Sequence, residues 1–268
     1  MRTIKFKSLS SGSCGNCYYL STGTDAIIID CGVGIRRFKK HLSEYGMKLG
    51  YIKALLITHD HSDHIKAAGK ISKEYHLPVY ATPLVHQGMD NSWQNSVKVP
   101  QELKRTIAFG ETFEIGPFSV TPFPVPHDAS ENTGYSIEVG GETFTIMTDV
   151  GEATDTVKRY ISLSSHLVFE SNYDDTMLQQ GRYPAVLKTR IASGHGHLSN
   201  AKAAQALADN MSDRLRHVWL CHLSEENNLP EIALETTATA LKQREKAGEE
   251  EVKVDVLRRT IPTGPFRL

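Results

Sequence analysis

Short apolar runs bounded by glycine, proline and polar clusters recur along the chain and predict β-strands. The stretch 107–147 is rich in such runs and turn signals, and Gly140-Gly141 predicts its clearest hairpin, between residues 135–139 and 143–147. The other predicted strands occupy residues 4–9, 17–21, 26–30, 53–57, 79–80, 166–169, 217–220 and 252–257.

Residues between these runs follow the spacing of helices, and the last third alternates strands with helices, which is typical of an α/β protein. We find no internal repeat, low-complexity tract or linker, so we expect one domain over residues 1–268, a length that can bury a sizeable core. The last residues, 258–268, are expected to form a tail. The predicted helices occupy residues 34–45, 65–75, 84–88, 184–192, 200–210 and 231–246.

Titratable residues stand at the ends of five apolar runs, where α/β folds place their sites. The run 54–57 continues into Thr58-His59-Asp60-His61-Ser62-Asp63-His64, and the other four ends carry Asp30, His127, Asp149 and His222. Histidine and aspartate are ligands of divalent metals such as zinc. A solvated loop would explain the cluster, and a structural role would explain each single residue. The five ends together favour a metal site.

Charge and cysteine content narrow the class of protein. The net charge of -1 excludes the global basic field common in nucleic-acid binders, so phosphate-backbone contacts would need a local patch. The run from Arg36 to Lys40 is one candidate, and a solvated helix face is the alternative. No apolar run suits a membrane span or signal peptide, so we expect a cytoplasmic protein with reduced thiols at Cys14, Cys17, Cys31 and Cys221, the first two buried.

The five strand ends, in this order, resemble the metallo-β-lactamase superfamily. The resemblance implies an αββα sandwich of two mixed β-sheets flanked by helices, with two divalent metal ions (Zn²⁺ or Mn²⁺, with iron also accepted) at one edge. Asp30 would orient ligand groups from outside the metal shell. The implied ligands are His59, His61 and His127 for one ion, Asp63, His64 and His222 for the other, and Asp149 as the bridge.

The bridging position argues against a β-lactamase, because the lactamases of this superfamily usually carry a cysteine where this chain has Asp149. In its transfer-RNA-processing phosphodiesterases, a glutamate after a strand pairs with a histidine in a glycine-rich turn and handles the scissile phosphate. Glu170 is the matching glutamate, and His195 or His197 is the matching histidine. The alternatives are a structural carboxylate and a hydrogen-bonded loop.

Within the superfamily, three segments resemble the YycJ/WalJ-type branch, which is associated with 5′ to 3′ DNA exonuclease activity: residues 10–16, 193–197 and 221–228. The resemblance implies a nucleic-acid substrate, DNA rather than RNA. The interval of about 70 residues between Asp149 and His222 is too short for an inserted clamp domain. The glycine-rich segment 10–16 could donate N–H groups to a phosphate or form an ordinary turn.

The implied mechanism is phosphodiester hydrolysis by a hydroxide generated between two metal ions. Asp63 and Asp149 would orient the hydroxide, and Glu170 with His197 or His195 would stabilise the leaving oxygen. Two alternatives stay open: a hydrolase of a small cyclic phosphodiester, ester or thioester on the same metals, and a non-enzymatic metal-binding protein. The intact ligand set disfavours the last.

Overall fold

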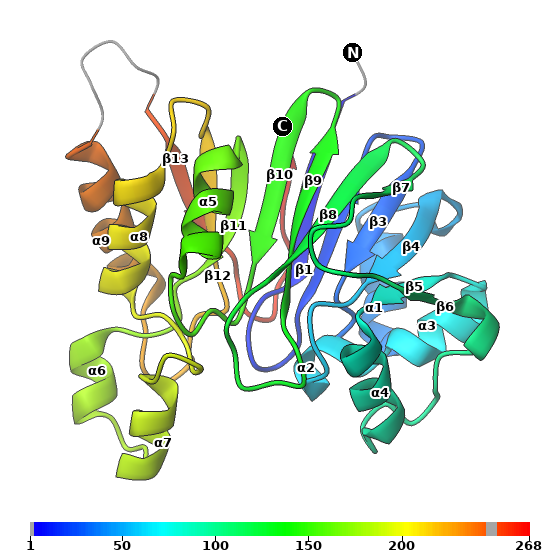
Figure 1. The fold of residues 1–268 in the computed structure, drawn as a ribbon, viewed down its shortest axis with the longest axis horizontal. Helices are drawn as coiled ribbons and strands as arrows, with labels where there is room; N and C mark the ends of the chain where they lie inside the picture. The colour runs from blue at the N-terminus through cyan, green and yellow to red at the C-terminus, as the bar shows by residue number, and fades with distance from the viewer. Residues whose placement is uncertain (1–2, 245–250) are drawn as a thin grey trace.

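Two seven-stranded sheets pack face to face in the computed structural model, which describes residues 3–244 and 251–268 (Figure 1). In the first sheet the order is β14 (Thr263–Arg267), β1 (Lys5–Ser10), β2 (Cys17–Ser21), β3 (Ala26–Ile29), β4 (Ile52–Leu56), β5 (Val79–Ala81) and β6 (Lys104–Thr106). In the second it is β13 (Lys253–Val256), β12 (His217–Cys221), β11 (His166–Glu170), β10 (Glu142–Met147), β9 (Thr133–Val139), β8 (Phe118–Pro124) and β7 (Phe113–Ile115).

Both sheets are mixed. The runs β3 to β6 and β10 to β13 are parallel, and the remaining neighbours are antiparallel. The predicted hairpin at Gly140-Gly141 is confirmed, because it joins β9 to β10. Parallel strands end at the same edge of a sheet, so β3, β4, β10, β11 and β12 carry the residues that follow them to one end of the sandwich.

Helices cover the outer face of each sheet. The first sheet is covered by α1 (Ile35–Glu44), α2 (Ser62–Ile65), α3 (Ala68–Tyr75) and α4 (Pro83–Asn91). The second sheet has α5 (Asp155–Leu163), α8 (Asn200–Asn210) and α9 (Pro230–Lys242), while α6 (Asp175–Gln180) and α7 (Ala185–Ile191) lie at its lower end in Figure 1. Two 3₁₀ turns, Leu49–Tyr51 and Gln101–Leu103, complete the elements of the described residues. The expected αββα sandwich is confirmed.

Three apolar layers explain why the chain folds this way. Alternate residues of the strands meet between the sheets, where Phe6, Phe144 and Trp219 pack with ring centroids 4.7–6.2 Å apart. The opposite faces of the same strands pack on the helices, for example Ile28 on Phe38 and Leu167 on Leu207 within their respective clusters. None of the described helices is both long and apolar enough to span a membrane.

Four expectations differ from the structure. The predicted tail forms β14 and pairs with β1, where Phe266 packs on Trp219 with centroids 5.2 Å apart. The proline and glycine of this segment are not typical of a strand, although an edge strand tolerates them. The predicted helix 65–75 is divided into α2 and α3, and α5 and α6 were not predicted. The predicted helix 231–246 ends at Lys242, and its last predicted residues, 245 and 246, lie outside the described residues.

Candidate metal centre

The turns that follow β3, β10 and β12 share an unusual backbone conformation. Asp30, Asp149 and His222 have φ angles of 59°, 57° and 55°, in the left-handed region that few residues other than glycine adopt. Each costs about 1–2 kcal/mol relative to a right-handed residue. The sharp turn places each side chain at the strand end, where the five predicted sites meet.

The first ligand group contains three histidines whose ligand atoms lie within 4.8 Å of one another: His59, His61 and His127. The Nδ1 atom of His59 lies 3.0 Å from the Thr58 hydroxyl, and that of His127 lies 2.9 Å from the Gly196 carbonyl. The Nε2 atoms of His59 and His127 are buried without a hydrogen-bond partner. Rings fixed through one nitrogen, with the other unpaired, are characteristic of metal ligands.

The second ligand group contains Asp63, His64 and His222, also within 4.8 Å of one another. The Asp63 Oδ2 atom lies 3.5 Å from Nε2 of His64 and 3.5 Å from Nε2 of His222. The Nε2 atom of His222 is buried and has no hydrogen-bond partner. This group therefore presents one carboxylate and two imidazoles to a common point.

Asp149 lies between the two groups. Its Oδ2 atom is 3.3 Å from Nε2 of His64, and its Oδ1 atom is 3.7 Å from Nε2 of His127. The side chain is 2% exposed and also accepts a hydrogen bond of 2.7 Å from the Thr148 hydroxyl. This is the position that a carboxylate bridging two cations would occupy.

Asp30 supports both groups from outside. Its carboxylate is fully buried, lies 2.7 Å from Nδ1 of His64, and accepts hydrogen bonds from the N–H and hydroxyl of Thr58 at 2.9 Å. Because the Thr58 hydroxyl also contacts His59, Asp30 is connected to one histidine of each group. The sequence pattern did not single out Thr58, although it directly precedes the histidine cluster.

Glu170 is paired with His197 rather than with His195. Its Oε1 atom lies 2.8 Å from Nδ1 of His197 and 3.0 Å from Nδ1 of His222, and its Oε2 atom accepts from the N–H groups of Val150 and Leu198. The carboxylate is fully buried, so it acts on its surroundings through the two histidines. The side chain of His195 is exposed and is not part of the ligand groups.

Burial and charge divide the histidines into two kinds. Burial, reinforced by His64, lowers the pKa of His59 well below its ordinary value, and burial also lowers the pKa of His127. Burial acts in the same direction on His222, but Asp149, Asp63 and Glu170 outweigh it and raise its pKa to about 10. The lowered pKa values of His59 and His127 favour their neutral rings, whereas a cation bound by His222 would replace a proton.

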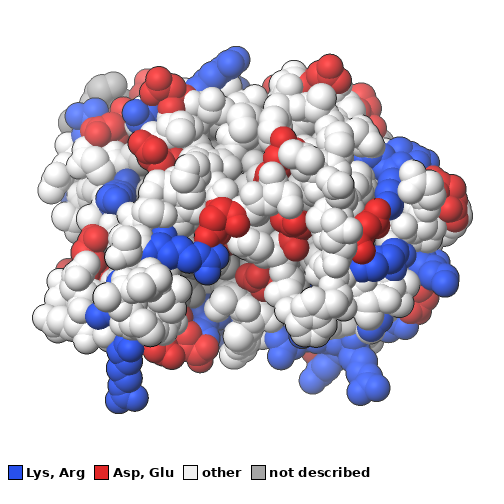
Figure 2. Space-filling model, turned by 60° about the horizontal axis from the view of Figure 1, so that its bottom comes forward, with Lys and Arg blue, Asp and Glu red and all other residues white. Residues whose placement is uncertain are grey.

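The residues present fit two divalent cations. Three buried imidazole nitrogens lack partners, and two carboxylates lie among them, so the cluster without cations leaves polar atoms unsatisfied. A set made only of histidine and aspartate suits zinc, manganese or iron. Figure 2, which brings this end of the sandwich forward, shows acidic side chains in the middle of the face and lysines and arginines toward its right and lower edges.

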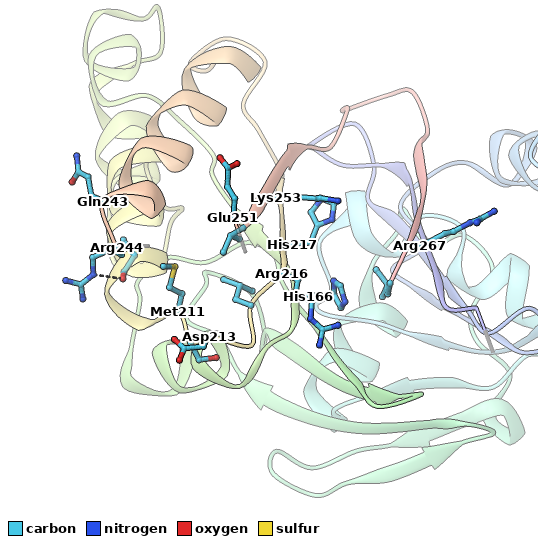
Figure 3. Close-up of a pocket in the computed structure, with 15 residues that line it drawn as sticks. His166, Met211, Asp213, Arg216, His217, Gln243, Arg244, Glu251, Lys253 and Arg267 are labelled. Atoms are coloured by element: carbon cyan, nitrogen blue, oxygen red, sulfur yellow. Dashed lines mark hydrogen bonds between the residues drawn. The ribbon is translucent and has the colours of Figure 1, made fainter. Parts of the chain in front are cut away.

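A cavity of about 200 Å³ adjoins the centre, lined by His197 and His222 together with Ser13, Asn172, Tyr183 and Arg190. The amide of Asn172 also donates a 2.7 Å hydrogen bond to the carbonyl of His222. A larger cavity of about 930 Å³ lies at the opposite ends of β11, β12 and β13, where His166, His217 and Lys253 line it (Figure 3). The larger cavity is therefore remote from the candidate metal centre.

The cysteines lie outside the ligand groups, and none is disulfide-bonded. Cys17, Cys31 and Cys221 are buried. Cys14 is exposed, so the expectation that it is buried was wrong. It lies in the loop between β1 and β2, where the turn at Gly12 and Gly15 carries it outward before the buried strand begins.

Comparisons with known proteins place the chain in a family. A family model described as the beta-lactamase superfamily domain matches residues 25–222. Exodeoxyribonuclease YycJ of Bacillus anthracis is 34% identical over 241 residues, or 90% of each chain. Exodeoxyribonuclease WalJ of Streptococcus pneumoniae is 34% identical over 240 residues, which cover 90% of this chain and 89% of that protein.

Solved structures show the same fold at lower identity. Zn²⁺-bound PqqB from Methylobacterium extorquens has a TM-score of 0.72 at 20% identity and covers 97% of this chain and 99% of that one. The metallo-β-lactamase fold protein YhfI from Bacillus subtilis has a TM-score of 0.71 at 16% identity, with 98% and 99% covered. The strand-end residues, the fold and these matches together show that the chain is a metallo-hydrolase of the metallo-β-lactamase superfamily.

Proposed function

We propose that this chain is a metal-dependent phosphodiester hydrolase, specifically a nuclease that degrades DNA from the 5′ end. The observation that carries the proposal is the Glu170–His197 pair, held 2.8 Å apart beside Asp149 and His222. Hydrolysis of an ester or thioester needs no such pair to handle a phosphate oxygen. The relatives named exodeoxyribonuclease, at 34% identity over 90% of the chain, support DNA as the substrate.

The proposed roles follow the two ligand groups. His59, His61 and His127 would hold one ion, Asp63, His64 and His222 the other, and Asp149 would contact both. When bound, two such ions supply a hydroxide nucleophile at neutral pH and offset the negative charge of the phosphate. Asp63 and Asp149 would orient the attacking group.

His197 is proposed to protonate the leaving oxygen. Burial acts to lower its pKa, but Glu170 outweighs this and raises the pKa above its ordinary value, which favours the protonated ring at neutral pH. With Nδ1 held by Glu170, the Nε2–H is the group available to a substrate in the adjoining 200 Å³ cavity. Glu170 is then a positioning residue, because its own oxygens are fully used.

One feature favours a polymer, and a second describes how open the site is. The loop leading into α1 is bonded to the metal cluster, with the Cys31 N–H donating to the His64 carbonyl at 2.7 Å, and Arg36 and Arg37 are exposed in the first turn of this helix. Between Asp149 and His222 the chain forms only α5, β11, α6, α7, α8 and β12. We therefore propose a single domain with an open site and no inserted clamp. We further propose that the protein acts in the cytoplasm with zinc or manganese.

The deciding experiment incubates metal-reconstituted protein with single- and double-stranded DNA and RNA labelled at the 5′ or the 3′ end. Immediate release of labelled mononucleotide from 5′-labelled DNA is expected, and the Asp63→Ala variant should release none. Absence of metal-dependent cleavage of every nucleic acid, with hydrolysis of a model ester or thioester, would replace the proposal with a small-substrate hydrolase.

A further inference from the structure

The glycine-rich segment before β2 faces the second ligand group with its polar groups turned inward. The sequence allowed it to donate N–H groups to a phosphate, but most of these donors already have partners. The N–H of Ser11 donates to the Arg259 carbonyl, that of Gly12 to the Asn16 Oδ1, that of Gly15 to the Gly12 carbonyl, and that of Asn16 to the Asp63 carbonyl. These four donors are therefore not available to a phosphate.

The side-chain amide of Asn16 has one permitted orientation. Its Oδ1 atom accepts from the Gly12 N–H at 2.8 Å and from the Tyr18 hydroxyl at 3.2 Å, so oxygen and nitrogen cannot be exchanged. Its Nδ2 atom then faces the centre, 3.3 Å from Oδ2 of Asp63 and 2.9 Å from Nε2 of His64. An amide nitrogen can only donate, so it supports the negative carboxylate of Asp63. Its contact with Nε2 of His64 uses the atom assigned to the second ion and has to open when that ion binds.

The main chain of Asn16 joins the same residues. Its N–H donates to the Asp63 carbonyl at 2.7 Å, and its carbonyl accepts from the Gly32 N–H at 2.8 Å. The junction admits no further atoms, because a Cβ on Gly32 would lie 1.5 Å from the Asp63 carbonyl oxygen and one on Gly15 would lie 2.9 Å from the Gly32 oxygen. Both the backbone and the carboxylate of Asp63 are thus held by one fully buried asparagine.

The network extends to the third ligand of the group. The Tyr18 hydroxyl lies 2.9 Å from the Ser11 hydroxyl, which accepts from the His222 N–H at 3.1 Å. Asn16 is therefore connected to Asp63, His64 and His222. None of these contacts involves the first ligand group.

We propose that Asn16 is a positioning residue that holds Asp63 in place for the second ion only. The inference rests on the ligand assignment proposed above. The glycine-rich segment then stabilises one half of the centre rather than binding a phosphate. The affinities for the two ions should therefore respond differently to a change at Asn16.

The test titrates the metal-free protein with Mn²⁺ or Zn²⁺ by calorimetry and counts bound ions by mass spectrometry. Wild-type protein should bind two ions. Asn16→Ala should bind the first ion normally and the second about 10–100-fold more weakly, the usual loss for a group that orients a ligand. Asn95→Ala, which removes a buried amide that donates to the Met89 carbonyl, should leave both affinities unchanged.

Tyr18→Phe provides a milder change if Asn16→Ala does not fold. It removes one hydrogen-bond donor to Oδ1 of Asn16. It should therefore weaken the binding of the second ion only, and by less than Asn16→Ala does. Unchanged affinity for both ions, or an equal loss for both, would overturn the inference. Because no substrate is used, a protein that binds two ions in this way but cleaves no nucleic acid would contradict the proposed function alone.

Discussion

The carboxylate of Glu170 lies 3.0 Å from Nδ1 of His222, so a buried acid is joined directly to a proposed metal ligand. The same oxygen lies 2.8 Å from Nδ1 of His197. One carboxylate therefore orients both a ligand of the second ion and the proposed proton donor. The proposed metal binding by His222 and the proposed proton donation by His197 therefore depend on the same carboxylate.

Glu170→Gln should lower kcat for a small phosphodiester by about 10²–10⁴-fold, because it removes the charge that keeps His197 protonated. His197→Ala should lower kcat within the same range. If the pair acts as a unit, the double variant should be no slower than the slower single variant. Steady-state kinetics on a thymidine dinucleotide, whose leaving alkoxide needs a proton, measures all three.

His195→Ala is the matched comparison for this pair, since the two histidines are two residues apart in the same turn. His195 is exposed and takes part in none of the Glu170 hydrogen bonds, so its loss should change kcat by less than about twofold. An equal loss for His195→Ala and His197→Ala would contradict the assignment of the proton donor to His197.

Asp149→Asn should remove the bridge while keeping the backbone. Asparagine tolerates the left-handed conformation as aspartate does, so the φ of 57° adds no new strain. We expect loss of at least one ion per chain and a fall in kcat beyond the about 10–100-fold typical of an orienting group. Metal content and kcat measured on the same preparation check this. Two retained ions with unchanged kcat would exclude a bridging role.

The sequence was sufficient to single out the proposed ligand residues, because their signal is local. Apolar strands ending in histidine or aspartate stand out without a structure, and in the folded chain these residues meet as predicted. The apolar runs predicted most of the strands, because strand patterns depend on burial, whereas the arrangement of the strands in two sheets was implied by the family resemblance. It placed Glu170 beside a histidine but could not say which one.

The features that the sequence did not reveal depend on contacts between segments that are far apart in the chain. Glu170 is saturated by N–H groups of Val150 and Leu198, which lie 20 and 28 residues away, so its burial cannot be read from its neighbours. Asn16 acts on Asp63 across 47 residues for the same reason. The strand β14 forms because β1 offers it an edge, against the local preference of its glycine and proline.

Replacing Arg36 and Arg37 together with glutamate should weaken DNA binding without slowing hydrolysis of bis(p-nitrophenyl) phosphate. Both side chains are exposed at the start of α1, which the Cys31–His64 hydrogen bond ties to the metal cluster. Each lost phosphate contact should reduce the slope of log affinity against log salt by about 1. Binding to duplex DNA between 50 and 200 mM salt measures the slope.

The matched control is Lys39→Glu with Lys40→Glu, because these lysines lie on the same helix but pair with Glu74 and Glu44. They should contribute less to DNA binding. An unchanged salt slope in the arginine variant, with cleavage of DNA retained, would show that this helix does not contact the substrate and that the polymer approaches from another side.

Acid should destabilise the protein through His166, which lines the larger cavity in Figure 3. Burial lowers the pKa of His166 to about 4, and Glu142 opposes the shift only in part. Between this value and the ordinary pKa of about 6.5, the unfolded chain binds more protons than the folded one, so stability falls as the pH drops through this window. At pH 5 the loss attributable to His166 is about 2 kcal/mol.

His166→Gln keeps a polar side chain that does not titrate, so its free energy of unfolding should depend less on pH than that of the wild type. Denaturant unfolding at pH 7.5 and pH 5.0 measures how much the free energy of unfolding of each protein changes between the two pH values. The contribution of the histidines of the metal centre cancels in the comparison, because both proteins contain them. The sign is specific: a His166 stabilised by its contact with Glu142 would make the variant more sensitive to acid than the wild type. Equal acid sensitivity of the two proteins would show that His166 is not held neutral in the folded state.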